Sequence, residues 1–178
     1  MIAFEENLIA LLKSIEECLA KGRILPCLML LYAGIDVVAS LEAGRAGPRA
    51  FRRWVNKYLL KSAPLRCTAS DLYGARCGIL HTFSAESDMS RKGQARQIVY
   101  AWGDAKAEDL ALAAKTLGRN DRVVHVRELV NAFRVGLTNY LDEVMQDENR
   151  KRKLYAGASL WFTHMNQQTM KTFLKAHA

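Results

Sequence analysis

The feature that most restricts the fold of this chain is an apolar segment at residues 24–41. Its hydrophobic side chains fall on all sides of a helix rather than in one stripe, so the segment needs cover from every direction. Pro26 suits the first turn of such a helix, because its missing N–H would have no partner there. Pro26 and Asp36 suit a bilayer poorly, and the segment is barely long enough to cross one. We therefore expect the central, buried helix of an α-helical domain and no membrane partner.

Apolar residues at spacings of three and four recur through most of the remaining chain, which is typical of amphipathic helices around a shared core. One expected helix begins after Thr68 or Ser70, whose hydroxyls can cap it, and stops near His81 or Thr82. The other expected helices lie at residues 4–19, 49–60, 105–117, 128–145 and 154–173. Since there is no repeat or linker, we expect a single domain over residues 1–178.

Two short segments have the β-branched and aromatic residues of strands instead, at residues 96–102 and 122–126. We expect them to pair antiparallel, supported by helices behind them. The polar residues 83–94 are expected to form a loop that either closes over a ligand or is simply exposed to solvent. The predicted fold class is therefore mainly α, a helical bundle with a small, hairpin-like two-stranded insertion.

Positive charge is concentrated in two segments of this chain of formal net charge +8. Residues 150–178 contain six Lys or Arg residues and no acid, and the denser run, residues 45–66, contains seven and no acid. Within the helix expected there, four bases fall outside the apolar face that carries Trp54 and Tyr58: Arg49, Arg52, Arg53 and Lys57. Such a surface attracts phosphate backbones, so these four are candidate nucleic-acid-binding residues. The alternative is an ordinary solvated helix face.

The four cysteines include no Cys-x2-Cys pair and sit among helical or apolar residues: Cys18, Cys27, Cys67 and Cys77. Neither a zinc site nor a disulfide framework is indicated, and the acidic N-terminus is wrong for a signal peptide. We expect a cytoplasmic protein without a metal or other cofactor. His125 lies in the second of the short strand-like segments, and His164 and His177 lie near the C-terminus with no acidic or thiol neighbour at ligand spacing. Each of the three is expected to be structural or exposed.

One twelve-residue segment, DLYGARCGILHT at residues 71–82, places Arg76 and His81 five positions apart near a helix end. This Arg-x4-His pair resembles the motif of the HEPN superfamily of helical-bundle proteins. The resemblance implies a metal-independent RNA-cleaving enzyme, or a relative that has lost catalysis, that acts as a homodimer with the two motifs meeting at the interface. Because several members belong to toxin or defence systems, it also implies a cognate antitoxin as a partner.

The two residue types suit this chemistry without the family name. Attack by the RNA 2′-hydroxyl needs a group that moves a proton near neutral pH, which His81 can do as general acid or base. It also needs a group that stabilises charge on the phosphate, for which Arg76 is suited.

Helix geometry adds a condition, because five residues along an ideal helix leave the two side chains roughly 140° apart in direction. The pair therefore predicts a distorted helix end or a dimer in which copies from two chains converge. Gly74 and Gly78 would let another helix approach closely, or would only relieve crowding. Cys77 stands where many catalytic relatives have a polar residue, and a thiol is a weak hydrogen-bond partner.

Two other functions therefore stay open. In the first, a non-catalytic helical dimerisation module, Arg76 is a structural ion-pair partner and His81 a helix-end residue favoured by the macrodipole. In the second, the protein binds nucleic acid without cleaving it, although Trp54 and Tyr58 fall on the expected core face rather than where they could stack on bases.

Overall fold

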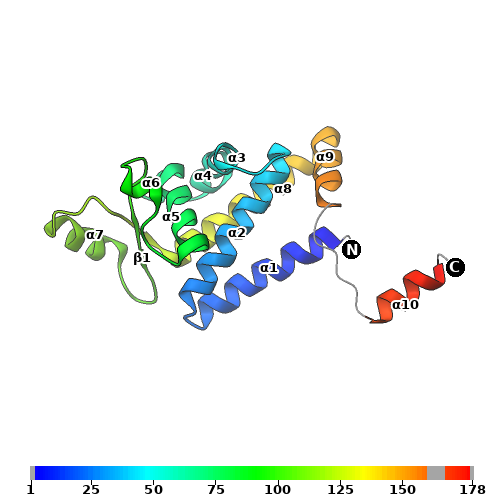
Figure 1. The fold of residues 1–178 in the computed structure, drawn as a ribbon, viewed down its shortest axis with the longest axis horizontal. Helices are drawn as coiled ribbons and strands as arrows, with labels where there is room; N and C mark the ends of the chain where they lie inside the picture. The colour runs from blue at the N-terminus through cyan, green and yellow to red at the C-terminus, as the bar shows by residue number, and fades with distance from the viewer. Residues whose placement is uncertain (1–2, 160–166, 177–178) are drawn as a thin grey trace.

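The computed structural model describes residues 3–159 and 167–176, and it is mainly helical with one small sheet (Figure 1). His164 and His177 lie outside the described residues. The elements are α1 (Ala3–Ala20), α2 (Ile24–Ala43), α3 (Pro48–Trp54), the π-helical turn η1 (Val55–Leu59), α4 (Leu60–Ser62), α5 (Ala69–Thr82), α6 (Asp88–Arg91), β1 (Ile98–Ala101), α7 (Ala107–Thr116), β2 (Arg122–His125), α8 (Val126–Met145), α9 (Glu148–Ala158) and α10 (Gln167–Ala176).

Helix α2 is the central helix, as the apolar segment predicts. It packs against α1, α3, α5, α8 and α9, and its buried side chains include Leu31, Tyr32 and Ile35. Gly44 ends it in the left-handed conformation, with φ 68°, which glycine adopts without steric cost. By length and composition α2 would also suit a membrane span, but in this fold its neighbours are other helices.

The basic segment forms one continuous helical stretch through α3, η1 and α4. The sequence predicts a regular α-helix here, whereas the structure has a π-helical turn, η1, in the middle. Trp54 and Tyr58 are buried at 1% and 2% exposure, in an aromatic cluster with Phe133 and Tyr140 of α8. Gly136 of α8 lies against the η1 backbone, where an added Cβ would be 3.0 Å from the carbonyl carbon of Tyr58. The aromatic face is therefore core, and neither ring is free to stack on a base.

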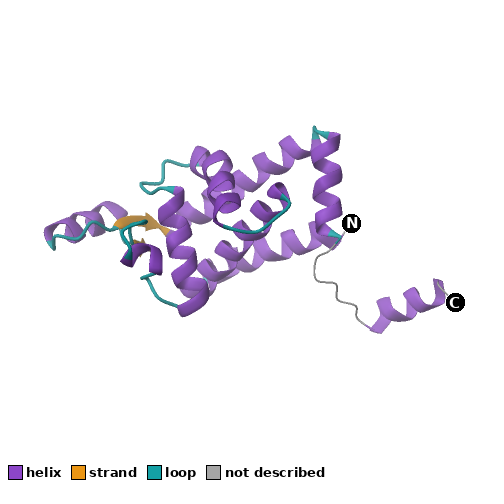
Figure 2. Ribbon diagram, turned by 45° about the horizontal axis from the view of Figure 1, so that its top comes forward, coloured by secondary structure: helices purple, strands orange, loops and turns teal. Residues whose placement is uncertain are grey.

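The two strands are parallel, so the antiparallel pairing expected from the sequence is wrong. Ile98 pairs with Arg122 and Ala101 with His125. Helix α7 lies between the strands in the chain and supplies the crossover that parallel strands need. The unit of β1, α7 and β2 lies at one end of the helical body (Figure 2). A 2.6 Å hydrogen bond between the hydroxyls of Tyr100 in β1 and Tyr32 in α2 connects the two parts.

Two other expectations need smaller corrections. The polar loop after α5 contains the helical turn α6, because the side chains and backbone of Ser87 and Ser90 form a reciprocal capping box. The last expected helix starts earlier than residue 154, because the side chain of Asp147 accepts bonds from two backbone N–H groups and begins α9 at Glu148. Part of that expected helix, residues 160–166, lies outside the described residues.

Candidate functional site on helix α5

The start of α5 is fixed by a hydrogen-bonded carboxylate. Thr68 and Asp71 form a capping box, and Asp71, only 2% exposed, also accepts bonds from the backbone and guanidinium of Arg96. Burial by itself raises the pKa of Asp71, but the bonds from Arg96 and Thr68 outweigh it and hold that pKa below its ordinary value. Helix α5 is therefore anchored to the chain before β1.

Arg76 and His81 meet within this one helix. Nη1 of Arg76 lies 3.0 Å from Nε2 of His81, and both residues belong to α5, which continues to Thr82. The expectation that the side chains diverge is therefore wrong. The angle between helix positions fixes the directions of the Cα–Cβ bonds, whereas the long arginine side chain brings its end group back to the imidazole.

This contact also indicates which ring nitrogen of His81 accepts. A guanidinium can only donate hydrogen bonds, so Nε2 of His81 is the acceptor, and a ring that accepts there carries its proton on Nδ1. His81 itself is exposed. In this contact the accepting nitrogen of His81 is therefore occupied by Arg76.

Asp36 of α2 is the third member of the site and was not identified from the sequence. Its Oδ2 accepts a 2.5 Å bond from Nε of Arg76, and the two side chains are 24% and 20% exposed. Burial raises the pKa of Asp36, because the loss of hydration outweighs the attraction of Arg76. The sequence did carry a signal, since Asp36 is the only charged residue in the apolar segment 24–41.

Tyr73, one turn before the motif, connects the site to the basic segment. The guanidinium carbons of Arg76 and Arg52 lie 5.8 and 5.9 Å from the centre of its ring, both within cation–π range. Phe51 of α3 packs edge-on against the same ring. One of the four candidate phosphate-binding bases, Arg52, therefore contacts the same tyrosine ring as Arg76.

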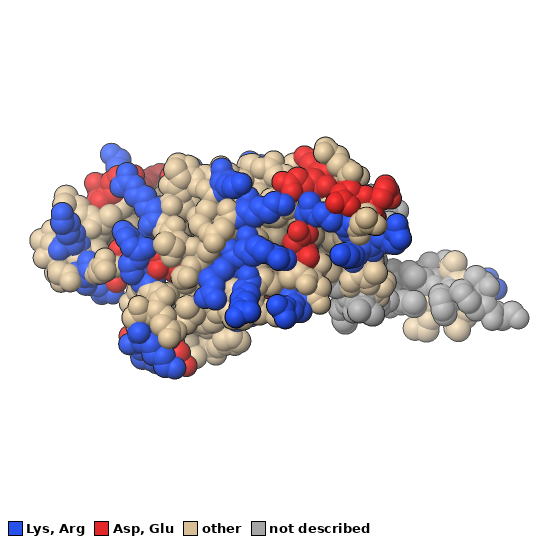
Figure 3. Space-filling view, turned by 90° about the horizontal axis from the view of Figure 1, so that it is seen from above, with Lys and Arg blue, Asp and Glu red and all other residues tan. Residues whose placement is uncertain are grey.

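The other three bases divide into two groups. Arg49 and Arg53 are exposed and, within the described ranges, form no ion pair. They belong to α3, and Lys and Arg side chains gather on the face that carries α3 and α4 (Figure 3). Lys57 instead donates a 2.7 Å bond to Glu143 of α8, which also accepts from Arg150. Lys57 therefore links η1 to α8 through its ion pair with Glu143.

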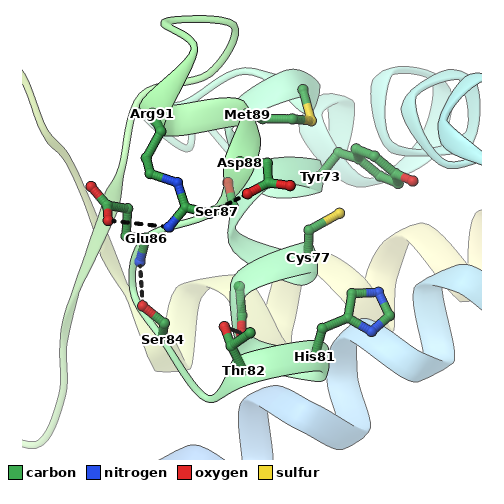
Figure 4. A pocket seen from close by; sticks show the side chains of 11 residues that line it. Tyr73, Cys77, His81, Thr82, Ser84, Glu86, Ser87, Asp88, Met89 and Arg91 are labelled. Atoms are coloured by element: carbon green, nitrogen blue, oxygen red, sulfur yellow. Dashed lines mark hydrogen bonds and ion pairs between the residues drawn. The ribbon is translucent and has the colours of Figure 1, made fainter.

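A pocket of about 420 Å³ opens beside His81, between α5 and the segment that follows it. We call it the α5–α6 pocket (Figure 4). Its α5 side is formed by Tyr73, Cys77, Gly78, His81 and Thr82. Its other side is formed by Ser84, Glu86, Ser87, Asp88, Met89 and Arg91.

Gly78 allows the backbone of residues 84–86, which forms one side of the pocket, to pack directly against α5. A Cβ added there would lie 2.5 Å from the carbonyl oxygen of Ser84 and 2.9 Å from that of Glu86. The backbone that approaches α5 is thus the chain's own following loop, and not a second helix as the glycine spacing suggested. The helix end also holds the exposed Phe83, which has a left-handed φ of 52°.

In the part of the chain that the structure describes, no three His, Cys, Asp or Glu side chains gather in a group that could hold a metal ion. His125 has a local role: its Nδ1 accepts a bond from the N–H of Arg127 and caps α8. Comparison of the chain with models of protein families, with curated proteins and with solved structures gave no match.

Proposed function

We propose that this protein is a metal-independent endoribonuclease with an HEPN-like helical fold, in which Arg76 clamps the scissile phosphate and His81 is the general acid/base. The observation that carries the proposal is the 3.0 Å contact between Arg76 and the exposed His81, with Arg76 held from its other side by Asp36. An arginine fixed through Nε can offer its Nη groups to a phosphate, Nη1 once the imidazole is displaced.

The resting contact suggests how RNA would start the reaction. A phosphate oxygen takes the place of the imidazole on Nη1 of Arg76, which releases the lone pair on Nε2 of His81. Nε2 then removes the proton of the 2′-hydroxyl, and the 2′-oxygen attacks phosphorus. The bond from phosphorus to the 5′-oxygen breaks, which leaves a 2′,3′-cyclic phosphate, while Arg76 stabilises the added charge on the phosphoryl oxygens.

The leaving 5′-oxygen needs a proton, and this requirement supports a homodimer. His81 is already the base in this scheme, and His125, the other histidine in the described ranges, is engaged as the cap of α8. The His81 of a second copy, in its protonated imidazolium form, can supply the proton if the two α5 helices face one another. Arg52 beside Tyr73, with Arg49 and Arg53 on the same helix, extends positive charge from the site along an RNA strand.

The deciding experiment is cleavage of an end-labelled single-stranded RNA by the purified protein in EDTA. We expect products that end in a 2′,3′-cyclic phosphate, and a loss of about 100-fold or more in rate for His81→Ala. His125→Asn is the matched control, because asparagine retains an N-cap. Cleavage that EDTA abolishes, or that His81→Ala retains, would refute the proposal.

The dimer has a separate test. Adding excess His81→Ala protein to the wild type, with time for subunits to exchange, should lower the activity per wild-type chain towards zero, because each mixed dimer lacks one proton-transfer group. Unchanged activity, together with a monomer mass in sedimentation, would exclude a shared site.

A second function, a non-catalytic helical module, is favoured by one observation. The Arg76–Asp36 pair joins α5 to the central helix and is largely buried, as a structural ion pair would be. This function predicts that Arg76→Ala destabilises the protein, whereas RNA is left intact by the wild type. The cytoplasmic location and the antitoxin partner stay predictions from the sequence.

A further inference from the structure

The α5–α6 pocket adjoins the contact between Arg76 and His81, where the proposed function places the scissile phosphate. His81 lines the pocket, and Arg76, which would hold the phosphate, bonds directly to His81. Tyr73, Cys77 and His81 are four residues apart, so they follow one side of α5 along the opening. A strand that presents its phosphate to Arg76 can therefore turn the neighbouring base into this pocket.

The lining combines apolar surface with a charged rim. Tyr73, Cys77 and Met89 are half-buried and supply surface against which a flat ring can pack. At the rim, the guanidinium of Arg91 pairs with the carboxylates of both Glu86 and Asp88. These three side chains are more than half exposed, so they can exchange partners when a ligand enters.

Guanine is the base that matches such a rim. It places two adjacent acceptors, O6 and N7, within reach of a guanidinium fork. Its N1–H and N2–H₂ groups are two adjacent donors, which together can face the two oxygens of one carboxylate. Adenine, cytosine and uracil each lack this combination of paired donors beside paired acceptors.

We propose that the α5–α6 pocket binds a guanine base of single-stranded RNA beside the phosphate engaged by Arg76 and His81, with Arg91 on its acceptor edge and Glu86 or Asp88 on its donor edge. The proposal rests on the proposed ribonuclease function for the identity of the ligand. It adds that cleavage occurs next to guanosine.

Binding can be measured without cleavage by using oligonucleotides whose 2′-oxygens are methylated and therefore cannot attack phosphorus. The probes are fluorescent 2′-O-methyl oligouridylates that carry a single guanosine, adenosine or cytidine, titrated with wild-type protein at low salt. We expect the guanosine probe to bind about tenfold more tightly than the other two. Arg91→Ala, and the double variant Glu86→Gln with Asp88→Asn, should each remove this preference.

Glu108→Gln is the matched control, because Glu108 is an exposed acid on α7 that faces Arg66 away from the pocket. It should keep the guanosine preference, and thermal unfolding should show that all variants fold. Equal binding of the three probes would overturn the pocket assignment, and so would a guanosine preference that survives the rim variants.

The failures of the two proposals are distinguishable. Chelator-resistant cleavage of RNA without guanosine preference would leave the ribonuclease standing and remove the base pocket. Guanosine-selective binding by a protein that cuts no RNA would support the base pocket and remove the ribonuclease. Absence of binding to every probe at low salt would remove both.

Discussion

Nη1 of Arg76 donates a hydrogen bond to Nε2 of His81 over 3.0 Å, within a single helix. The contact makes the two side chains one unit, in which the arginine occupies the nitrogen that would act as a base. Asp36 holds the opposite edge of the same guanidinium at 2.5 Å. The order Asp36, Arg76, His81 runs from the half-buried Asp36 on the central helix to the exposed His81 beside the pocket, and the expected effects of substitution follow from it.

Arg76→Lys should show whether the proposed phosphate clamp depends on the shape of the guanidinium as well as on its positive charge. A lysine keeps the positive charge but cannot bond Asp36 on one edge and a phosphate on another, as the guanidinium does. We expect RNA cleavage in EDTA to fall about 100-fold, the size of effect seen when one charge-stabilising donor is removed. Retention of full activity would show that Arg76 is not the phosphate clamp.

Asp36→Asn should lower activity without a comparable loss of stability. The amide oxygen can still accept the bond from Arg76 but no longer fixes it by charge, so we expect cleavage to fall about tenfold through misplacement of the clamp. Burial raises the pKa of Asp36 in the folded state, so its stabilising contribution is present below the unfolded pKa and is lost as pH rises through the folded value.

At neutral pH the cost of burying the ionised carboxylate of Asp36 offsets its attraction to Arg76. We expect Asp36→Asn to change the free energy of unfolding at pH 7 by less than about 1 kcal/mol in urea denaturation. A much larger loss would indicate that the Asp36–Arg76 pair is a structural ion pair, as the non-catalytic alternative requires.

The basic face should affect binding through salt-dependent interactions with phosphate. Arg49→Ala combined with Arg53→Ala should weaken binding of non-cleavable RNA, and should reduce the slope of log affinity against log salt by about 0.7 for each phosphate that is no longer neutralised. Lys13→Ala is the control, because Lys13 is an exposed base on α1. An unchanged slope would mean that the gathered charge is only a solvated helix face.

Glu143 should contribute to stability only above acidic pH. Its hydrogen bond to Lys57, together with bonds from Tyr58 and Arg150, lowers its pKa to about 2. Its contribution is therefore complete above the unfolded pKa and is lost as pH falls towards 2. Because its side chain is 47% exposed, we expect Glu143→Gln to cost only about 0.5 kcal/mol at pH 7.

Urea denaturation at pH 7 and near pH 2.5 measures this difference. The stability gap between Glu143→Gln and the wild type should be smaller at the lower pH. A gap that grows on acidification would contradict the role assigned to the bonds of Glu143.

Much of the helical architecture was predictable from the sequence, because burial leaves a local pattern. The apolar surface on all sides of residues 24–41 required a central helix, and the spacing of Leu129, Phe133 and Tyr140 marked the inner face of α8. The strand direction was not predicted correctly. Side-chain alternation is the same in parallel and antiparallel strands, and the helix between them was the available signal.

The sequence by itself determined that Arg76 and His81 stand five residues apart on one helix next to a basic segment. The tertiary structure decided what that spacing means. Asp36 reaches Arg76 from forty residues away because α2 packs on α5, and Gly78 admits the loop that forms the pocket wall. Local sequence patterns encode the direction of each Cα–Cβ bond, whereas the meeting of long side chains depends on which helices pack together.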